Sequence, residues 1–133
     1  MLPIKRSLRF RVWDNQGTKY LENVESFIIE LISDTKGKTL EYKEDDQTNF
    51  TFQESTGMMT DDGQEIFEGD IIEFVWTGLK RLAQIKYKLG AYISEIIEKE
   101  SGTNFYWLHA IVMFDCPIKI VGNIKENPEF LIT

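Results

Sequence analysis

The chain has 133 residues, a formal net charge of −7 and a hydrophobic fraction of 42%, which is typical of a folded globular protein and excludes wholesale disorder. No apolar run approaches the ~20 residues of a membrane helix, no signal peptide is recognisable, and the single cysteine, Cys116, excludes an intramolecular disulfide. We therefore expect one cytoplasmic domain without membrane contact, within which residues 1–48 are a candidate N-terminal lobe and residues 49–133 a barrel-like part.

The first 48 residues open with an alternating pattern. Apolar and basic side chains alternate over residues 8–13, which is the period of a half-buried strand. Turn-forming residues at 14–17 and 34–37 separate this strand from others, which we expect at residues 18–21, 24–32 and 39–42. The segment 24–32 also fits the spacing of a helix, but its β-branched and aromatic residues favour a strand.

From Phe50 onwards, short apolar or alternating segments are separated by breaks that contain glycine. We expect strands at residues 50–52, 64–67, 71–76, 82–87, 92–97, 105–114 and 118–121. Breaks fall at residues 55–57 and 68–70, and Asp62-Gly63 predicts a type I′ hairpin turn, in which both central residues have positive φ. The segment 105–114 is the most apolar one and predicts a central strand, or two strands with a bend.

The spacing of strands and glycines favours a mainly β fold with few or no helices. Short strands separated by glycine breaks are typical of a compact, strongly curved antiparallel sheet. We therefore expect a barrel-like architecture, either an SH3-like small barrel or a sandwich.

Charge is unevenly distributed along the chain. Residues 1–20 carry a net charge of +4, residues 21–70 carry −11, and the remaining residues balance. The net acidity repels nucleic-acid phosphates at long range. Two local groups of bases are nevertheless candidate nucleic-acid contacts, namely Arg9 and Arg11 in one group and Lys80, Arg81, Lys86 and Lys88 in the other. The structural interpretation, which we favour, is that these bases line solvated strand faces or pair with carboxylates across a sheet.

The sequence lacks the residue combinations of common catalytic and metal sites. His109 is the only imidazole and lies in the most apolar segment, so we expect a core or interface residue. Cys116 has no basic neighbour that would lower its pKa, and a single His with a single Cys excludes a structural zinc site within one chain. The carboxylates Glu65, Glu68 and Asp70 lie close together but are expected to be turn residues. We therefore expect no catalytic residue, cofactor or metal, and no enzymatic activity.

Three blocks of residues stand out by their motifs. The first is RFRVWD at residues 9–14, and the second is TG at 56–57 with DDGQEIFEGDII at 61–72. The third is IVGNIKENPEFL at 120–131. Together and in this order the three blocks resemble the YopX family of phage and prophage proteins, and the resemblance spans nearly the whole chain. The second block is here more acidic than is usual in the family because Asp62 precedes Gly63.

The resemblance implies a mainly β, barrel-like fold and a phage or prophage origin, but no catalytic residue or binding site. The prominent residues of the blocks then have an architectural interpretation. Glycines allow the required backbone conformations, Asp and Asn side chains form hydrogen bonds within turns, and tryptophans pack against neighbouring side chains. These residues are Trp13, Asp14, Gly57, Gly63, Gly69, Asp70, Gly122 and Asn123, to which we add Trp76 outside the blocks.

We expect a non-catalytic module that binds an unidentified protein partner or a second copy of itself. Exposed strand faces that carry Trp13, Tyr87 or Tyr92 would provide the contact, because aromatic residues are enriched at interfaces, and an open sheet edge would allow strand addition. One alternative is a nucleic-acid-binding small barrel, in which the six basic residues surround Trp76 or Tyr87. A second alternative is an acidic nucleic-acid mimic that inhibits a host enzyme through residues 41–70.

Overall fold

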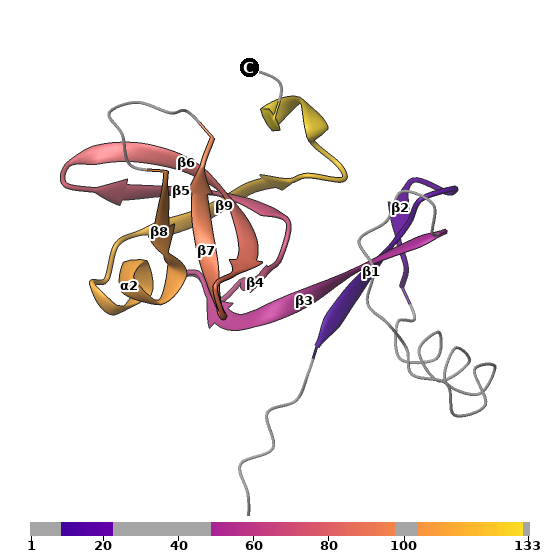
Figure 1. Ribbon diagram of the computed structural model, residues 1–133, viewed down its shortest axis with the longest axis horizontal. Helices are drawn as coiled ribbons and strands as arrows, with labels where there is room; N and C mark the ends of the chain where they lie inside the picture. The colour runs from indigo at the N-terminus through magenta and orange to yellow at the C-terminus, as the bar shows by residue number, and fades with distance from the viewer. Residues whose placement is uncertain (1–8, 23–48, 98–103, 132–133) are drawn as a thin grey trace, which may run out of the picture. The chain divides into compact units, whose positions relative to one another are not determined.

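A computed structural model of the chain describes residues 9–22, 49–97 and 104–131 (Figure 1). The chain divides into two compact units, Met1–Glu54 and Ser55–Thr133. The strands expected at 24–32 and 39–42, and the turn between them, lie outside the described residues. Where the structure describes the chain, strands predominate, and the prediction of a mainly β, antiparallel fold is confirmed.

In the first unit, β1 (Phe10–Asp14) pairs antiparallel with β2 (Lys19–Tyr20) and with the first half of β3 (Phe50–Met59). The turn after β1 is held by Asp14, whose Oδ1 accepts a hydrogen bond of 3.0 Å from the backbone N–H of Gln16. Val12 and Trp13 are both buried. Because successive strand side chains point to opposite faces, β1 is covered on both faces at this point rather than on one.

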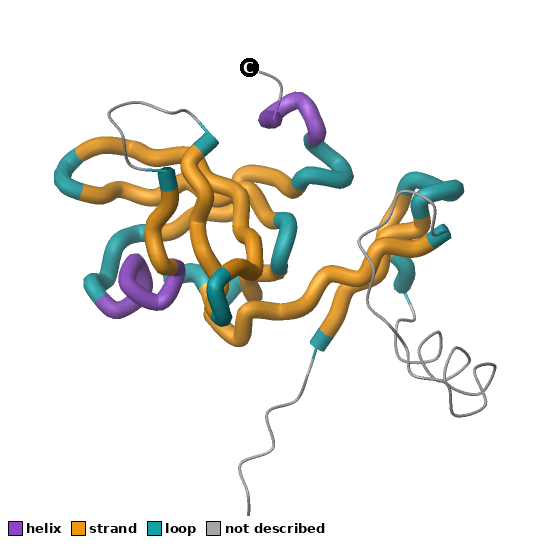
Figure 2. The backbone as a smooth tube through the Cα atoms, viewed as in Figure 1, coloured by secondary structure: helices purple, strands orange, loops and turns teal. Residues whose placement is uncertain are grey.

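The second unit is built around a five-stranded antiparallel sheet with the order β8-β7-β6-β5-β9. Its strands are β5 (Asp70–Trp76), β6 (Leu79–Lys88), β7 (Ala91–Ile96), β8 (Phe105–Trp107) and β9 (Ile118–Asn123). The sheet curls into a half-barrel, as Figure 2 shows. This curvature was expected from the sequence, and it gives the sheet a concave face on which a core forms.

The strand β3 is longer than its pattern predicts. A break was expected at residues 55–57, but β3 continues through them to Met59. Its second half pairs with β4 (Glu65–Phe67), and the register shifts between Ser55 and Met59, where Gly57 has a φ of 76°. The glycine therefore marks a bulge within the strand rather than its end, because pairing with β4 resumes beyond it at Met59.

The turn after β3 differs in type from the prediction. Of its two expected central residues only Gly63 has positive φ, and its N–H donates to the carbonyl of Thr60 at 3.0 Å. A loop of residues 61–63 thus replaces the type I′ turn. Positive φ at both central residues occurs instead at Thr77-Gly78 and Leu89-Gly90, which join β5 to β6 and β6 to β7.

The expectation for residues 105–114 was wrong. Only Phe105–Trp107 forms a strand, β8, and the chain then turns into the helix α2 (Leu108–Met113). Leu108 and Ile111 are fully buried, which is the i, i+3 spacing of one helical face. The helical period was not visible in the sequence because Val112 and Met113, which lie on the exposed side of the helix, are apolar as well.

The core of the second unit lies between the concave face of the sheet and α2. Phe74 and Ile72 of β5 lie on this face together with Ala83 and Ile85 of β6, and all four are buried. Leu108 and Ile111 of α2 complete the cluster from the other side. The C-terminal residues Pro128–Leu131 form a single 3-10 turn. In the part of the chain that the structure describes, no helix is long and apolar enough to cross a membrane.

Candidate binding surface

Two of the three sequence blocks meet at one end of the five-stranded sheet. Asp70 is 1% exposed, and its Oδ2 accepts a hydrogen bond of 2.8 Å from the N–H of Phe67. The neighbouring Gly69 has a φ of 90°, donates to the carbonyl of Ile85 and accepts from the N–H of Ile124, both at 2.9 Å. The Glu-Gly-Asp turn of the second block is therefore bonded both to β6 and to the third block.

The third block forms a hydrogen-bonded turn around Asn123. The Oδ1 of Asn123 accepts from the backbone N–H groups of Lys125 and Glu126, at 3.1 and 2.9 Å, and the Oδ1 of Asn127 accepts from the N–H of Asn123 at 3.2 Å. A Cβ at Gly122 would lie 2.6 Å from that Asn127 oxygen, so no larger residue fits without displacing it. These side chains are engaged in holding the backbone.

The acidic residues and the histidine that could have formed a reactive site lie on different elements. Glu65 belongs to β4 and Asp70 to the start of β5, whereas His109 belongs to α2. His109 is exposed and stacks on Trp107 with ring centroids 6.0 Å apart. Of the two expected locations, core or interface, the core is therefore wrong. The described residues contain no group of three or more His, Cys, Asp or Glu side chains that could hold a metal.

The two candidate contacts of the first unit, Arg9 and Arg11, lie next to and on β1. The Nε of Arg11 donates to the Oε1 of Gln53 at 2.7 Å, and its guanidinium lies 4.8 Å from the ring centre of Tyr20. Tyr20 donates to the same Gln53 oxygen at 2.9 Å. Arg11 is thus part of the packing between β1, β2 and β3, whereas Arg9 is exposed.

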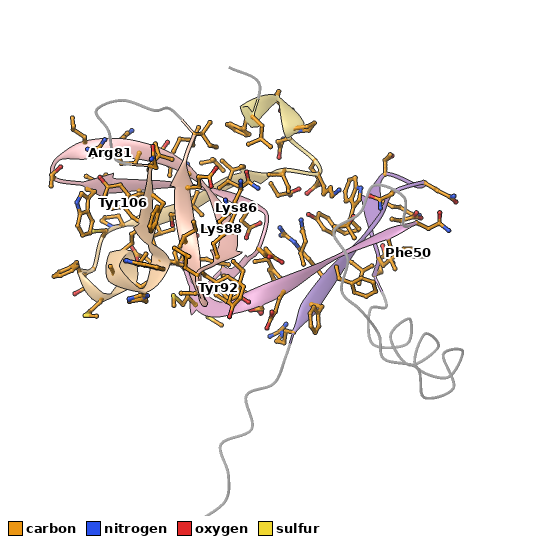
Figure 3. All side chains as sticks on the ribbon, in the orientation of Figure 1. Phe50, Arg81, Lys86, Lys88, Tyr92 and Tyr106 are labelled. Carbon is orange, nitrogen blue, oxygen red and sulfur yellow. The ribbon has the colours of Figure 1, made fainter. Side chains whose placement is uncertain are left out.

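The lysines of β6 pair with glutamates on the neighbouring strands. Lys86 and Lys88 both bind Glu95 of β7, at 3.1 and 3.3 Å, and Lys80 lies 3.9 Å from Glu73 of β5. Burial by itself raises the pKa of Glu95, but the hydrogen bonds and positive charges of Lys86 and Lys88 outweigh this effect and lower the pKa below its usual value. These cross-strand pairs satisfy much of the basic charge of β6. Figure 3 labels Lys86 and Lys88 on this strand.

The Glu95 pairs predict a pH-dependent contribution to stability. Because the pKa of Glu95 is lower in the folded chain than in the unfolded one, its ionised form stabilises the fold above the usual Glu pKa, and this contribution disappears as the pH falls through the lowered pKa. We expect Glu95→Gln to lower the free energy of unfolding near neutral pH by less than about 1 kcal/mol, since the pair is partly solvated. Urea unfolding of both proteins measures this difference.

The same difference should vanish at the lowest pH at which both proteins remain folded. Glu73→Gln is the matched control, because the Lys80 side chain that faces Glu73 is 77% exposed and the pair is longer, and no measurable change is expected. A Glu95→Gln effect that persists unchanged in acid would show that the glutamate does not act through its charge.

The aromatic residues expected to be exposed are mostly buried. Trp13 is 7% exposed and packs edge-to-face on Tyr20, and Tyr92 is 8% exposed and packs on Tyr87. Tyr87 itself is exposed. The strand faces proposed for partner contact are therefore largely part of the internal packing, and Tyr87 alone of the three remains accessible.

An exposed apolar surface lies instead where α2 ends beside the β5–β6 hairpin. Phe114, at the end of α2, is 67% exposed, and Met113 before it is 69% exposed. Phe114 packs on Trp76 with ring centroids 5.7 Å apart, and Trp76 packs on Tyr106 at 5.3 Å. Leu79, which is 58% exposed, is the cross-strand partner of Trp76. We call the following set the apolar surface: Trp76, Leu79, Tyr106, Val112, Met113 and Phe114.

The order of the residues in α2 indicates this surface, whereas the apolar composition of the segment alone does not. The helix α2 has Leu108 and Ile111 on its buried face, and Val112 and Met113 on its exposed face. A helix on the outside of a soluble domain normally has polar residues on its outer face. The apolar composition of residues 105–114 predicted a central strand, or two strands with a bend, and gave no indication of an exposed helical face.

Comparisons with known proteins bear on both the sequence blocks and the curled sheet. The sequence model described as YopX protein matches residues 9–132, which is nearly the entire chain. The chain belongs to the YopX family. The blocks that meet around Asp70 and Asn123 thus lie within the family match, and they include Gly122, whose small size the structure requires.

The fold of this YopX-family protein also resembles a solved structure. The crystal structure of protein EF1440 from Enterococcus faecalis matches with a TM-score of 0.58 and 23% sequence identity, over 96% of this chain and 99% of that one. At this identity the likeness shows a shared fold. Among curated proteins none matches the chain.

Proposed function

We propose that this YopX-family protein is a non-catalytic protein-binding module whose contact surface is the apolar surface. The observation that carries the proposal is that the end of α2 has apolar side chains on its exposed side as well: Ile111 is buried against the sheet, while Met113 and the following Phe114 are exposed. Large apolar side chains that lie together on a protein surface mark a site of contact with another molecule. The exposed face of α2 is therefore suited to being covered by another protein chain.

The neighbouring residues support a protein interface rather than a reactive site. Tyr106, Trp76 and Phe114 form a chain of rings that pack on one another. Rigid aromatic side chains lose little conformational freedom on binding and are enriched among the residues that dominate binding energy. Self-association through the same surface is one form that this function takes.

The test compares the wild-type protein with the double variant Met113→Gln, Phe114→Ser. Both side chains are largely exposed, so the variant is expected to stay folded. We expect the wild type to self-associate in light scattering, or to retain a host protein in affinity capture from prophage-bearing bacteria, and the double variant to do neither.

Leu89→Ser provides the matched control for this experiment. Leu89 is 80% exposed but lies at the β6–β7 turn, beyond the opposite end of β6 from Leu79. Its replacement removes exposed apolar area without touching the apolar surface and should leave association unchanged. A wild type that is a strict monomer and captures the same proteins as the double variant would refute the proposed function.

We further propose that the protein is encoded by a phage or prophage and acts in the bacterial cytoplasm. The family resemblance supports the first point, and the single cysteine, which suits a reducing compartment, supports the second. Phage genes on both sides of the coding sequence, and recovery of the protein in the soluble cytoplasmic fraction, are the expected findings. Recovery in the periplasm or medium would contradict the proposed location.

A further inference from the structure

The loop between β3 and β4 contains Asp62-Gly63, the only place in the sequence where an Asp or Asn precedes a Gly. In an unstructured chain such a pair is chemically labile, because glycine has no side chain to obstruct the approach of its backbone nitrogen to the preceding carboxyl group. Both residues are exposed, so water reaches the pair. The fold must therefore either permit or suppress a reaction at this position.

The reaction of the pair is an isomerisation that needs only water. The nitrogen of Gly63 attacks the carboxyl carbon of protonated Asp62, a C–N bond forms, and the amide proton and the carboxyl hydroxyl leave together as water. Hydrolysis of the cyclic imide returns one water. Cleavage at the side-chain carbonyl restores Asp62, whereas cleavage at the backbone carbonyl gives isoaspartate, in which the chain continues through the side chain.

The turn holds Asp62 in a conformation that does not react. The N–H of Gly63 donates to the carbonyl of Thr60 at 3.0 Å, which closes a β-turn over residues 60–63. Because neither Asp61 nor Asp62 has positive φ, the turn is of type I, in which the third residue has a ψ of about 0°. The Cβ of Asp62 and the nitrogen of Gly63 are then about a third of a rotation apart around the Cα–C bond, whereas the imide ring requires them to be eclipsed.

Thr60 uses all of its polar groups to keep this turn closed. Besides the bond from Gly63, its N–H donates to the carbonyl of Gln64 at 2.8 Å, and its Oγ1 accepts from the N–H of Gln64 at 3.0 Å. The same hydroxyl donates to the Oδ1 of Asp62. Thr60 itself is 5% exposed. The rotation that the reaction needs turns the N–H of Gly63 away from Thr60, so the reaction competes with these hydrogen bonds.

We propose that Asp62 is a latent modification site, at which spontaneous isomerisation to isoaspartate is suppressed by the hydrogen bonds of Thr60. Isomerisation then proceeds only from the fraction of molecules in which the loop has opened. The product has one more backbone carbon between β3 and β4. Because β4 carries the fully buried Ile66, we expect the isomerised chain to hold this strand less firmly, with faster hydrogen exchange at its amides.

The test incubates the full-length wild type and Thr60→Val in heavy-oxygen water, at mildly acidic pH and well below the Tm of both. Each passage through the imide leaves one heavy oxygen atom at Asp62, and a protein isoaspartate methyltransferase labels the isomerised fraction, so mass spectrometry measures both. We expect Thr60→Val to react about tenfold faster than the wild type, because the loss of two hydrogen bonds raises the open fraction. A synthetic peptide of residues 58–66 should react at least about tenfold faster than the wild type as well.

Three controls make the result specific to Thr60. Thr60→Ser keeps the hydroxyl and should react within about twofold of the wild-type rate. Thr51→Val removes another buried threonine hydroxyl, which donates to Asn15 at 3.2 Å in the first unit, and should leave the reaction of Asp62 unchanged. Asp61 is the control within each molecule, because it precedes an Asp and not a Gly and should take up much less heavy oxygen.

The remaining outcomes would overturn the proposal. A wild type that reacts as fast as the peptide would show that the fold gives no protection. Equal rates in Thr60→Val and wild type, or an equal acceleration in Thr51→Val, would remove the specific role of Thr60. Thr60→Val that is unfolded under the assay conditions would assign the hydroxyl to the stability of the whole unit. None of these outcomes involves the apolar surface, so the proposed function is tested separately.

Discussion

Phe74→Ala is expected to lower the free energy of unfolding by about 3–5 kcal/mol, because it empties the centre of the core. Phe74 is 1% exposed and packs edge-to-face on Tyr106, with ring centroids 5.7 Å apart. It belongs to the cluster that joins the concave face of the sheet to α2. Loss of the ring removes both its apolar burial and its aromatic contact, and the rigid strands around it cannot close the cavity completely.

Urea or thermal unfolding followed by circular dichroism measures this effect. Phe74→Leu should cost less than half as much, since it retains most of the buried volume. Phe114→Ala is the surface control: its ring is 67% exposed, so a loss below about 1 kcal/mol is expected. Equal losses for Phe74→Ala and Phe114→Ala would mean that the core is not where the structure places it.

Asp70→Ala is expected to lower the free energy of unfolding by about 2–3 kcal/mol, because it leaves the N–H of Phe67, which donates a partly buried hydrogen bond, without its acceptor. The carboxylate binds the N–H of Phe67 at 2.8 Å, and the residue is almost completely buried. The same turn carries Gly69, which is bonded to Ile85 and Ile124. Loss of Asp70 should therefore also weaken the hydrogen bonds by which this turn connects β6 to the C-terminal turn.

Two further variants make the Asp70 result specific. Asp70→Asn retains one oxygen acceptor and should cost less than Asp70→Ala, while the exposed Asp61→Ala should leave stability unchanged within about 0.5 kcal/mol. Hydrogen exchange should become faster at the amides of Phe67 and Gly69 in Asp70→Ala before it does so in the centre of β6. If Asp70→Ala were as stable as Asp61→Ala, the architectural role of this block would be wrong.

These predictions distinguish the residues that stabilise the fold from the residues that we propose to bind a partner. Phe74 and Asp70 are buried and support the sheet, so their loss affects stability first. Met113 and Phe114 are exposed, and their replacement should affect association without unfolding the protein. Binding experiments should therefore use the exposed residues and avoid Phe74, although its ring lies beneath Tyr106 of the apolar surface.

Much of the strand pattern was predictable from local residue order. The alternation along β1 and the glycine breaks around β5 identified these strands, with ends displaced by at most two residues, because side-chain period and turn chemistry are local properties. Leu89-Gly90 was less obvious, since Leu rarely adopts the positive φ of 56° found there. Its turn is enforced by the pairing of β6 with β7.

The tertiary structure determines which residues are buried. Burial of Trp13 depends on β3, whose pairing joins Arg11 to Gln53, 42 positions away in the chain. The helix α2 and its exposed Phe114 were hidden in an apolar run that fits several structures equally well. The local order of the residues thus predicted a mainly β fold and the turn motifs of the family. The apolar surface arose only when distant segments packed together, because burial is a property of contacts between segments far apart in the sequence.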